Sequence, residues 1–473
     1  MLKRLAMALI ALTTAWSQPV TAADYYVAAD GVIFPGTPNG SLTHPWKTVT
    51  DALNSGRING GDNILLMDGE HGILKVQKSF TSAVTIKSQN ARNAHVEYIY
   101  VLAPTNNLIV QDLKVWPTNP LVHPSVLVYS GSGTADNQFI NLDIRAGKDA
   151  FNYINWSAAD WLARAMDGAM MDGDRMEVRQ STFTGVHFGV VISGVDGVVA
   201  SNLIDGFSAD GLRGNGARGN FRDNIVKNCI SVDGNHADGF QAFSSSAITG
   251  LVLERNTIIE WELVKSHPLR CGLQGIGMFD GFFDNLTIRN NVIAVRNGHG
   301  ISVFGARHAT ITNNTVVNVD GIQPGYPWIG IFPNKNGTPS TDVIVANNIA
   351  MAYSGVTDKA NRVSFINNRI SRNPDFAYVD ISTFNYEPKP TSRFIDAADP
   401  LYAPALDTDR HKRPSGAGPD VGAIEVGSTA AASPPIAAPP PPITAATDKA
   451  DAIAAIAAAT GSQGTSAKFV PAP

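Results

Sequence analysis

A short motif that recurs seven times between residues 167 and 334 constrains the fold more than any other feature of this sequence. Each copy reads as one variable residue, a Gly and then alternating apolar positions, and successive copies start 21 to 36 residues apart. Spacing this irregular indicates constant strands joined by loops of variable length. Repeats of this size stack, and each buries its apolar face only against its neighbours. The copies start at Asp167, Phe188, Asp210, Asp238, Gln274, His299 and Ile329.

Asparagine recurs between these copies, within runs of alternating apolar residues. At one point of each repeat an Asn can take the left-handed backbone conformation at a bend and bond the backbones of its stacked neighbours. We therefore expect an asparagine ladder, and Asn141 fits an earlier position of the same series. Strand, Asn bend, strand, loop and strand make a coil of about 22 residues, as in a parallel β-helix. The ladder residues are Asn202, Asn224, Asn256, Asn291, Asn314, Asn348 and Asn368.

The composition along the chain predicts three parts. Residues 1–23 combine a basic start, an apolar run and small residues, and predict a cleaved signal peptide and a secreted or periplasmic bacterial protein. Residues 24–426 form the predicted all-β domain. A β-propeller is less consistent with the repeat spacing, because each of its blades would need about 40 residues. Residues 427–473 are rich in Ala and Pro and predict a disordered, flexible tail. We find no later run of about 18 apolar residues that would predict a membrane span.

Charge and cysteine content narrow the class of protein further. The chain has 36 basic and 41 acidic residues and a net charge of -5, so it lacks the global positive field that holds a nucleic-acid backbone. We expect a monomer. The two cysteines, Cys229 and Cys271, either pair in an oxidising compartment or remain separate buried thiols.

The repeats also predict columns of side chains, since equivalent positions of successive coils lie about 4.8 Å apart. If Leu212, Phe240, Ile276 and Ile301 point inward, strand alternation turns the first, fourth and sixth motif positions outward. These columns mix polar and aromatic residues, which suits a groove that binds sugars, although exposed rings can also simply stabilise a sheet. The candidate substrate-binding residues are Gln241, Gln274, Ser302, Phe243, Phe279 and Phe304.

Asp210 and Asp238 are predicted to lie in adjacent coils, within several ångströms of each other. Two close carboxyl groups raise the pKa of one of them. Such a pair can serve a glycoside hydrolase, can bind Ca²⁺ with its hard oxygen ligands, or can cap turns without any chemical role.

At this point the chain resembles the pectate-lyase-like superfamily of secreted right-handed parallel β-helix proteins. The segments 25–31, 44–53 and 61–69 look like the opening strand, short N-terminal cap helix and first coil of its bacterial members, and 409–425 is similar to their C-terminal end. The resemblance implies a pectin-lyase-like solenoid whose substrate is an acidic polysaccharide. It points to polysaccharide lyases and polygalacturonase-like hydrolases.

Two short motifs carry this resemblance into the groove. The run Gly298, His299 and Gly300 is similar to the Gly-His-Gly motif of polygalacturonases, although their Arg-x-Lys element is absent here. His236 and Asp238 resemble the His-x-Asp arrangement of β-helix uronate epimerases, which implies a base or substrate-binding role for His236. We expect His187 to be an ordinary surface or turn residue.

The leading hypothesis is a polysaccharide lyase that cleaves a uronate-containing glycan by β-elimination. That reaction needs a cation to neutralise the uronate carboxylate and a base to remove the C5 proton. We expect the insertion 260–271 to overhang the groove and to bring basic residues to it, with Asp210 and Asp238 bound either to Ca²⁺ or to substrate hydroxyl groups. The alternatives are a glycoside hydrolase, a uronate C5-epimerase and a non-catalytic glycan-binding surface protein. The catalytic candidates are Asp210, Arg213, His236, Asp238, Lys265, Arg270 and His299.

Overall fold

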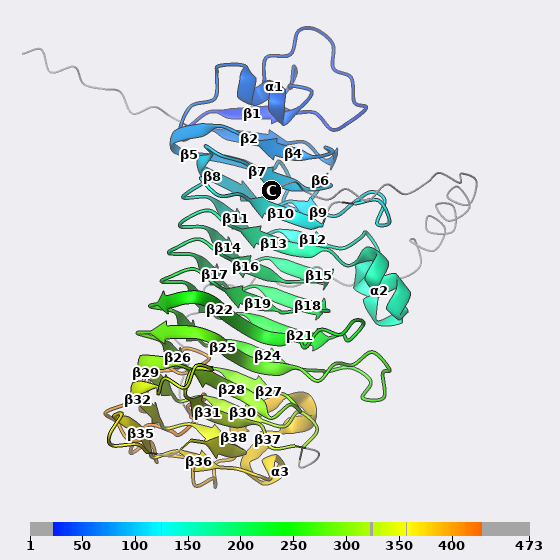
Figure 1. Cartoon of the computed structure of the whole chain (residues 1–473). Helices are drawn as coiled ribbons and strands as arrows, with labels where there is room; N and C mark the ends of the chain where they lie inside the picture. The colour runs from blue at the N-terminus through cyan, green and yellow to red at the C-terminus, as the bar shows by residue number, and fades with distance from the viewer. Residues whose placement is uncertain (1–21, 124, 322–324, 356, 428–473) are drawn as a thin grey trace, which may run out of the picture. The chain divides into compact units, whose positions relative to one another are not determined.

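The computed structural model describes residues 22–123, 125–321, 325–355 and 357–427. The predicted tail lies outside these residues, apart from Gly427, and so does the predicted signal peptide, apart from its last two positions. The described chain winds through successive coils, and nearly every strand pairs in parallel with the strand one coil away (Figure 1). This arrangement confirms the predicted parallel β-helix.

Each full coil gives one strand to each of three faces, which we call the first, second and third face in chain order. The first face consists of β4 (Leu74–Val76), β7 (Ile99–Val101), β10 (Val126–Ser130), β13 (Asp167–Met171), β16 (Val190–Ile192), β19 (Leu212–Gly214), β22 (Asp238–Thr249), β25 (Gln274–Asp284), β28 (His299–Phe304), β31 (Trp328–Phe332) and β34 (Ala352–Ser354). The second face consists of β1 (Asp24–Val27), β2 (Asn63–Leu66), β5 (Ser79–Ser88), β8 (Asn106–Gln111), β11 (Gln138–Ile140), β14 (Glu177–Arg179), β17 (Val198–Ala200), β20 (Asn220–Arg222), β23 (Val252–Glu254), β26 (Thr287–Arg289), β29 (Ala306–Thr312), β32 (Thr341–Ala346) and β35 (Val363–Ile366).

The third face consists of β3 (Gly69–Glu70), β6 (Ala94–Val96), β9 (Lys114–Val115), β12 (Asp143–Arg145), β15 (Thr182–Val186), β18 (Leu203–Phe207), β21 (Ile225–Cys229), β24 (Thr257–Ile259), β27 (Val292–Ala294), β30 (Thr315–Val317), β33 (Ile349–Ala350) and β36 (Arg369–Ile370). Within the described residues it is a separate sheet of 12 strands, whereas pairing is continuous across the other two faces, which form one sheet of 24 strands.

The core is a set of stacked apolar columns inside the coils. Leu212, Phe240, Ile276 and Ile301 pair in register across four coils and are at most 1% exposed, which confirms their predicted inward direction. Arg213, the neighbour of Leu212, faces outward on the same strand and is only partly buried. Burying each large apolar side chain contributes about 1.5 to 3 kcal/mol, so the repeated columns stabilise the coils collectively.

The asparagine ladder lies at the bend between the second and third faces. The side-chain oxygen of Asn224 accepts the backbone N–H of Asn202 at 3.0 Å, and that of Asn256 accepts the backbone N–H of Asn224 at 3.1 Å. The Asn202 amide in turn donates to the carbonyl of Val178. All three asparagines are nearly fully buried, so these bonds satisfy polar groups that would otherwise lie unpaired in the core.

The backbone at this bend differs from the expectation in one respect. The left-handed conformation belongs to the residue before each ladder asparagine, as at Arg255 with φ 54° before Asn256. Asn141 is itself left-handed with φ 54°, so it is not a ladder residue, and Ser181 begins the ladder by accepting the N–H of Leu142. The positions before the seven ladder residues are Ser201, Asp223, Arg255, Asn290, Asn313, Asn347 and Asn367.

Short elements close the two ends and one side of the stack. Helix α1 (Val49–Asn54) begins with a capping box between Thr48 and Asp51, which confirms the predicted N-terminal cap helix. An insertion between β12 and β13 forms the 3₁₀ helix η1 (Ala150–Asn155) and helix α2 (Ala158–Arg164). After the last coil come α3 (Pro374–Ala377), β37 (Tyr378–Asp380), η2 (Ile381–Thr383) and β38 (Asn385–Pro388). In the described part of the chain, every helix is too short or too polar to cross a membrane.

Residues 394–425, which we call the C-terminal strap, run back along the bend of the last coils. Their backbone carbonyl groups accept hydrogen bonds from the side chains of left-handed asparagines, each of which directly precedes one ladder asparagine. Asn290 donates to Leu406, Asn313 to Asp420, Asn347 to Asp399 and Asn367 to Ala397. The left-handed residues therefore also serve as anchors for this segment.

Candidate functional site

The candidate site lies on the outer side of the first face, at β19, β22, β25 and β28. Asp238 pairs in register with Gln274, and the pairing of Leu212 with Phe240 places Asp210 beside Asp238 one coil earlier. The second predicted column is also present, since Arg213, Gln241, Gly277 and Ser302 pair in succession across four coils. The structure therefore brings together most of the residues that were predicted for the groove.

Asp210 is buried and both of its carboxylate oxygens are occupied. Oδ2 accepts hydrogen bonds from the guanidinium of Arg213, with Nε at 2.9 Å, and Oδ1 accepts the backbone N–H of Asp238 at 3.0 Å. Burial raises the pKa of Asp210, while the neighbouring Arg213 opposes that shift. The ion pair with Arg213 holds Asp210 in place as an anion.

Asp238 is fully buried and only half satisfied. Its Oδ2 accepts a hydrogen bond from Nε2 of Gln241 at 3.0 Å, and Nδ1 of His236 lies 3.9 Å away, whereas Oδ1 has no hydrogen-bond partner among the described residues. Burial, and secondarily the charge of Asp210, raise the pKa of Asp238 to about 8. The neighbouring carboxylate thus adds to the effect of burial, as expected for two adjacent carboxyl groups, and Asp238 carries a proton at neutral pH.

Two features above Asp238 suit a protonated carboxyl group. Gln274, its register partner in the next coil, has a buried side-chain oxygen that also lacks a donor. A protonated carboxyl group at Asp238 is a hydrogen-bond donor of the kind that this oxygen lacks. Gly277 makes room for the carboxyl group, because a Cβ there would collide with Asp238 Oδ1 and with the ring of Phe279.

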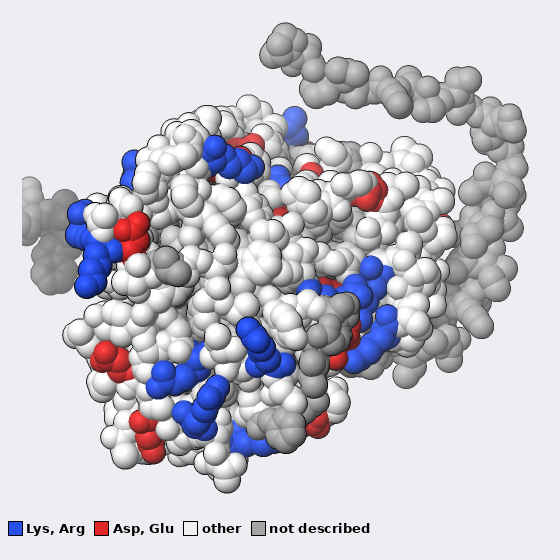
Figure 2. All heavy atoms as spheres, turned by 60° about the horizontal axis from the view of Figure 1, so that its bottom comes forward, with Lys and Arg blue, Asp and Glu red and all other residues white. Residues whose placement is uncertain are grey.

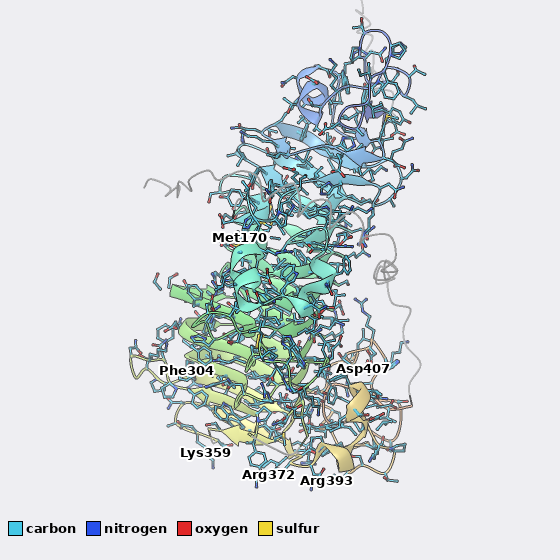
Figure 3. All side chains as sticks on the ribbon, turned by 90° about the vertical axis from the view of Figure 1, so that its right-hand side faces the viewer. Met170, Phe304, Lys359, Arg372, Arg393 and Asp407 are labelled. Atoms are coloured by element: carbon cyan, nitrogen blue, oxygen red, sulfur yellow. A yellow bond between two sulfur atoms is a disulfide. The ribbon has the colours of Figure 1, made fainter. Side chains whose placement is uncertain are left out.

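Calcium does not fit the Asp210 and Asp238 pair as it is arranged. Ca²⁺ takes six to eight oxygen ligands, but only Oδ1 of Asp238 is free among the four carboxylate oxygens. A second acidic group, Asp407 with Asp409 and His411, lies in the strap. Oδ1 of Asp407 accepts the backbone N–H groups of Asp409 and His411, and Oδ2 accepts that of Glu425. Figure 3 shows Asp407 on the opposite side of the stack from Met170 and Phe304 of the first face.

His299 is held in a compact group of side chains two coils beyond Asp238. Its Nδ1 lies 2.9 Å from Oγ of Ser302, and the indole N–H of Trp328 donates to the same hydroxyl oxygen at 3.0 Å. Burial lowers the pKa of His299, which is therefore a neutral imidazole at neutral pH. Trp328 occupies none of the predicted column positions and was therefore not among the expected groove residues.

The register of the seventh motif copy differs from the prediction. An irregularity in the pairing of β28 with β31 places Trp328, not Ile329, beside His299, and Gly330, not Phe332, beside Ser302. Phe332 instead pairs with Phe304, and their rings stack with centroids 4.6 Å apart. The regular spacing of apolar residues hides such a bulge, so this shift could not be read from the motif.

Aromatic rings flank the acidic pair on both sides. The guanidinium of Arg213 lies over the rings of Phe188 and Phe243, at 4.3 and 5.1 Å. On the other side, Phe279 lies 5.1 Å from the ring of His299 and 5.6 Å from that of Phe304. Phe243 does not continue the Phe279 column, because a bulge pairs it with Asp280. It is 41% exposed and available to a ligand.

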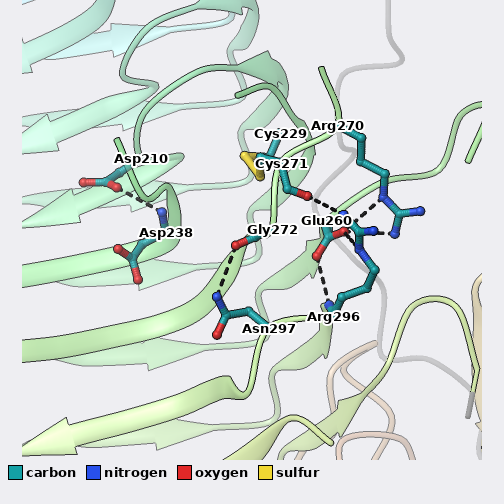
Figure 4. Close-up of a disulfide and its surroundings, with 9 residues drawn as sticks. All are labelled: Asp210, Cys229, Asp238, Glu260, Arg270, Cys271, Gly272, Arg296 and Asn297. Carbon is teal, nitrogen blue, oxygen red and sulfur yellow. Dashed lines mark hydrogen bonds and ion pairs between the residues drawn. A yellow bond between two sulfur atoms is a disulfide. The ribbon is translucent and has the colours of Figure 1, made fainter. Parts of the chain in front are cut away.

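The insertion between β24 and β25 does not supply the basic cluster that was expected over the groove. Arg270 is buried and forms ion pairs with Glu260 and Asp320, and Lys265 also pairs with Asp320. His267 lies against Trp261 and contacts the carbonyl of Ile154 in η1. Figure 4 shows the ion pairs around Glu260 on the far side of the disulfide from Asp210 and Asp238.

The physical reason for this correction is the buried Glu260. A fully buried carboxylate needs cationic partners, and Arg270 and Arg296 provide them. The same region holds a disulfide between Cys229 and Cys271, so the two cysteines pair and are not separate buried thiols. Arg270 and Lys265 are therefore engaged in these ion pairs and are not catalytic candidates of the groove.

One pair of groove residues was missed. Nδ1 of His187 lies 2.9 Å from the carboxylate of Asp167, and the ring of His187 packs against Phe188 beneath Arg213. The signal was present, because Asp167 and Phe188 occupy the first column and His187 directly precedes Phe188. His187 thus lies in the bend before β16, as expected, and the carboxylate of Asp167 orients its ring.

Charge is distributed evenly over the part of the surface that can be seen in one view. On the face shown in Figure 2, basic and acidic side chains lie in small mixed groups and uncharged residues cover most of the surface. That face offers no continuous basic patch of the kind that a nucleic-acid backbone requires.

The comparisons with known proteins agree with this fold. A family model described as "Right handed beta helix region" matches residues 167–323, the part of the chain that holds most of the motif copies. The chain is a right-handed parallel β-helix protein. No curated protein matches the sequence.

Solved structures with a similar fold include several named for carbohydrate chemistry. The pectate lyase Pel9A is 16% identical, with a TM-score of 0.50 over 86% of this chain and 96% of its own. XylC in complex with xylose is 10% identical, with a TM-score of 0.49 over 86% of this chain and 99% of its own. A rhamnogalacturonan lyase is 14% identical, with a TM-score of 0.41 over 86% and 97%. At 16% identity the likeness to Pel9A shows the fold alone.

Proposed function

We propose that this protein is a polysaccharide lyase that cleaves an acidic, uronate-containing polysaccharide by β-elimination in the groove on the first face. The observation that carries the proposal is the buried Asp238, whose pKa of about 8 provides a general acid at neutral pH. The pectate lyase Pel9A has a similar fold, which supports the class of reaction but does not identify the substrate.

The proposed reaction uses Asp238 as the acid and His236 as the base. The imidazole of His236, which is largely exposed, removes the C5 proton of the uronate. The electron pair forms the C4–C5 double bond, the C4–O4 bond breaks, and the carboxyl group of Asp238 protonates the departing O4. The proton on His236 then returns to Asp238, whose Oδ2 lies 3.9 Å from Nδ1 of His236.

The remaining groove residues prepare this acid and bind the substrate. Arg213 fixes Asp210 as an anion, and the negative charge of Asp210 helps to keep Asp238 protonated. Gln241 covers the carboxyl group of Asp238, so the incoming sugar must displace its amide. Gln274 and the exposed ring of Phe243 are proposed to contact the neighbouring sugars.

A hydrolase that uses Asp210 and Asp238 is less consistent with the geometry. Hydrolysis needs a second carboxylate with a free oxygen, to attack the sugar or to activate water. Both oxygens of Asp210 are already occupied by Arg213 and by the backbone of Asp238. Elimination needs an acid beside a base, which Asp238 and His236 offer, and the proposed cation for the uronate carboxylate is Arg213, which is paired with Asp210.

The test is a screen of the purified protein against polygalacturonate, alginate and other uronate polymers. Elimination produces a C4–C5 unsaturated sugar that absorbs in the ultraviolet, whereas hydrolysis produces reducing ends without that absorbance. We expect Asp238→Asn to abolish the absorbance increase and Asp196→Asn, a surface carboxylate paired with Arg218, to leave it unchanged. Reducing ends without absorbance would refute the elimination.

The uronate C5-epimerase alternative would share the base but not the acid. An epimerase exchanges the C5 proton with solvent and leaves the polymer intact. Incubation in D₂O followed by proton NMR separates the two, because incorporation of deuterium at C5 without a fall in polymer length would indicate epimerisation. Secretion, the boundaries at residues 24 and 426 and a monomeric state remain part of the proposal.

A further inference from the structure

The hydroxyl group of Ser302 contacts Nδ1 of His299 and the indole nitrogen of Trp328. These contacts determine which ring nitrogen of His299 carries the proton. Trp328 can only donate, so its N–H bond to Oγ of Ser302 at 3.0 Å makes that oxygen the acceptor. Ser302 is fully buried, and its own hydroxyl hydrogen therefore needs an acceptor. Among the described residues, the acceptor within reach is Nδ1 of His299, at 2.9 Å.

This arrangement assigns the tautomer of the neutral imidazole. If Ser302 donates to Nδ1, the lone pair of Nδ1 is engaged and the single ring proton lies on Nε2. Adding a second proton at Nδ1 would leave the hydroxyl hydrogen of Ser302 buried without a partner. Burial of the ring separately lowers the pKa of His299.

His187, at the other end of the groove, has the opposite arrangement. Its Nδ1 faces the carboxylate of Asp167 at 2.9 Å, and an ionised carboxylate can only accept. The neutral ring of His187 therefore carries its proton on Nδ1 and has its lone pair on Nε2. The two histidines differ in the partner of Nδ1, so the tautomer of one is a control for that of the other.

We propose that His299 is held as the Nε2–H tautomer by Ser302 and Trp328 and donates a hydrogen bond to an acceptor oxygen, a carboxylate or hydroxyl group, of the bound glycan. His299 is then a substrate-binding residue and not a general base, and Ser302 and Trp328 are its positioning residues. The glycan as ligand rests on the proposed function, whereas the tautomer does not.

The surroundings of His299 fit this role. Edge-on contacts with the rings of Phe279 and Trp328, with centroids 5.1 and 4.8 Å away, fix the imidazole plane. Gly298 provides the room for the indole, because a Cβ at that position would collide with Trp328. His299 lies two coils beyond Asp238, about 10 Å at the usual strand spacing, so it contacts a different sugar from the one that is cleaved.

The tautomer is tested first, on the full-length protein without any ligand. Nitrogen-15 NMR of histidine-labelled protein distinguishes a protonated ring nitrogen from an unprotonated one, and His299→Gln identifies the signals. We expect protonated Nε2 for His299 and protonated Nδ1 for His187. Trp328→Phe keeps a ring but removes the donor, so the tautomer of His299 should become mixed and its pKa should rise.

The binding role is tested with whichever uronate polymer the protein cleaves. We expect His299→Ala to raise KM about 10-fold with a smaller change in kcat, and His299→Gln, which keeps an N–H donor, to recover most of the loss. A proton on Nδ1 of His299, an unchanged tautomer in Trp328→Phe, or a loss confined to kcat would overturn the proposal. If no polymer is cleaved, the proposed function fails, while the NMR result still decides the tautomer.

Discussion

Replacing Asp238 by Asn should make the protein more stable at alkaline pH, although it removes the proposed catalytic acid. In the folded protein the pKa of Asp238 is raised to about 8, whereas the same group in an unfolded chain titrates near 3.9. The folded state therefore holds a proton that the unfolded state releases between these two pH values. Stability is greatest below about pH 4 with respect to this group and falls as pH rises towards 8.

The size of the effect follows from the shift. Four pKa units correspond to about 6 kcal/mol, since each unit is worth about 1.4 kcal/mol. The source is the transfer of an ionised carboxyl group into a fully buried position beside the negative charge of Asp210. Asn has a similar shape and cannot ionise, so the variant avoids this loss.

The measurement is the melting temperature of both proteins from pH 4 to pH 9, with denaturant unfolding at the two extremes. We expect the curves to lie close together near pH 4 and the Asn variant to be the more stable by several kcal/mol near pH 9. A constant difference across the range, or a difference that is largest in acid, would refute the raised pKa of Asp238.

Asp223→Asn is a matched control with the opposite sign. Asp223 accepts hydrogen bonds from Arg255 and Arg410, and these cations lower its pKa against the effect of burial. A carboxyl group whose pKa is lower in the folded state stabilises the protein at pH values above its pKa in the unfolded chain. This stabilisation is lost as the pH falls into the acid range. The Asp223 variant should therefore be less stable than wild type at pH 7, and the difference should disappear as the pH falls.

Three further outcomes follow from the structure. Replacing Cys229 and Cys271 by Ser opens a loop of 42 residues and should lower stability by about 4 kcal/mol, so wild type treated with reductant should melt at the same temperature as the double variant. Asn256→Ala removes side-chain bonds to two neighbouring coils and should cost about 2 to 4 kcal/mol in denaturant unfolding, whereas the exposed Asn235→Ala should cost almost nothing. Activity should be unaffected by EDTA, and restoration by Ca²⁺ after chelation would contradict the proposed acid.

The sequence predicted the regular part of the molecule because a strand must alternate. Once Leu212 and Phe240 were assigned to the interior, the outward direction of Arg213 and Gln241 followed, and the structure has them paired in register. The prediction of the columns failed at Phe243 and again at Ile329, where bulges shift the pairing of the strands. A bulge changes no apolar spacing in the sequence and becomes visible only when two strands are paired.

The position of the long insertion could not be predicted for a different reason. Its basic residues suggested a groove loop, but Arg270 turned out to neutralise the buried Glu260. The sequence shows that a charge is present and not which partner it meets, since partners such as Asp320 lie 50 residues away. Long-range compensation of buried charge is therefore the main source of error in assigning this candidate site.

The C-terminal strap changes how a stack of coils can be expected to unfold. In a simple solenoid each repeat contacts only its neighbours, so stability is local and the ends can fray independently. Here Arg410 reaches back to Asp223, 187 residues earlier, and the strap also bonds Asn290 and Asn367. The last coils are thus tied together in one cooperative unit. During synthesis this unit can form only after the strap has left the ribosome, so a chain shortened before residue 394 would leave its final coils uncovered.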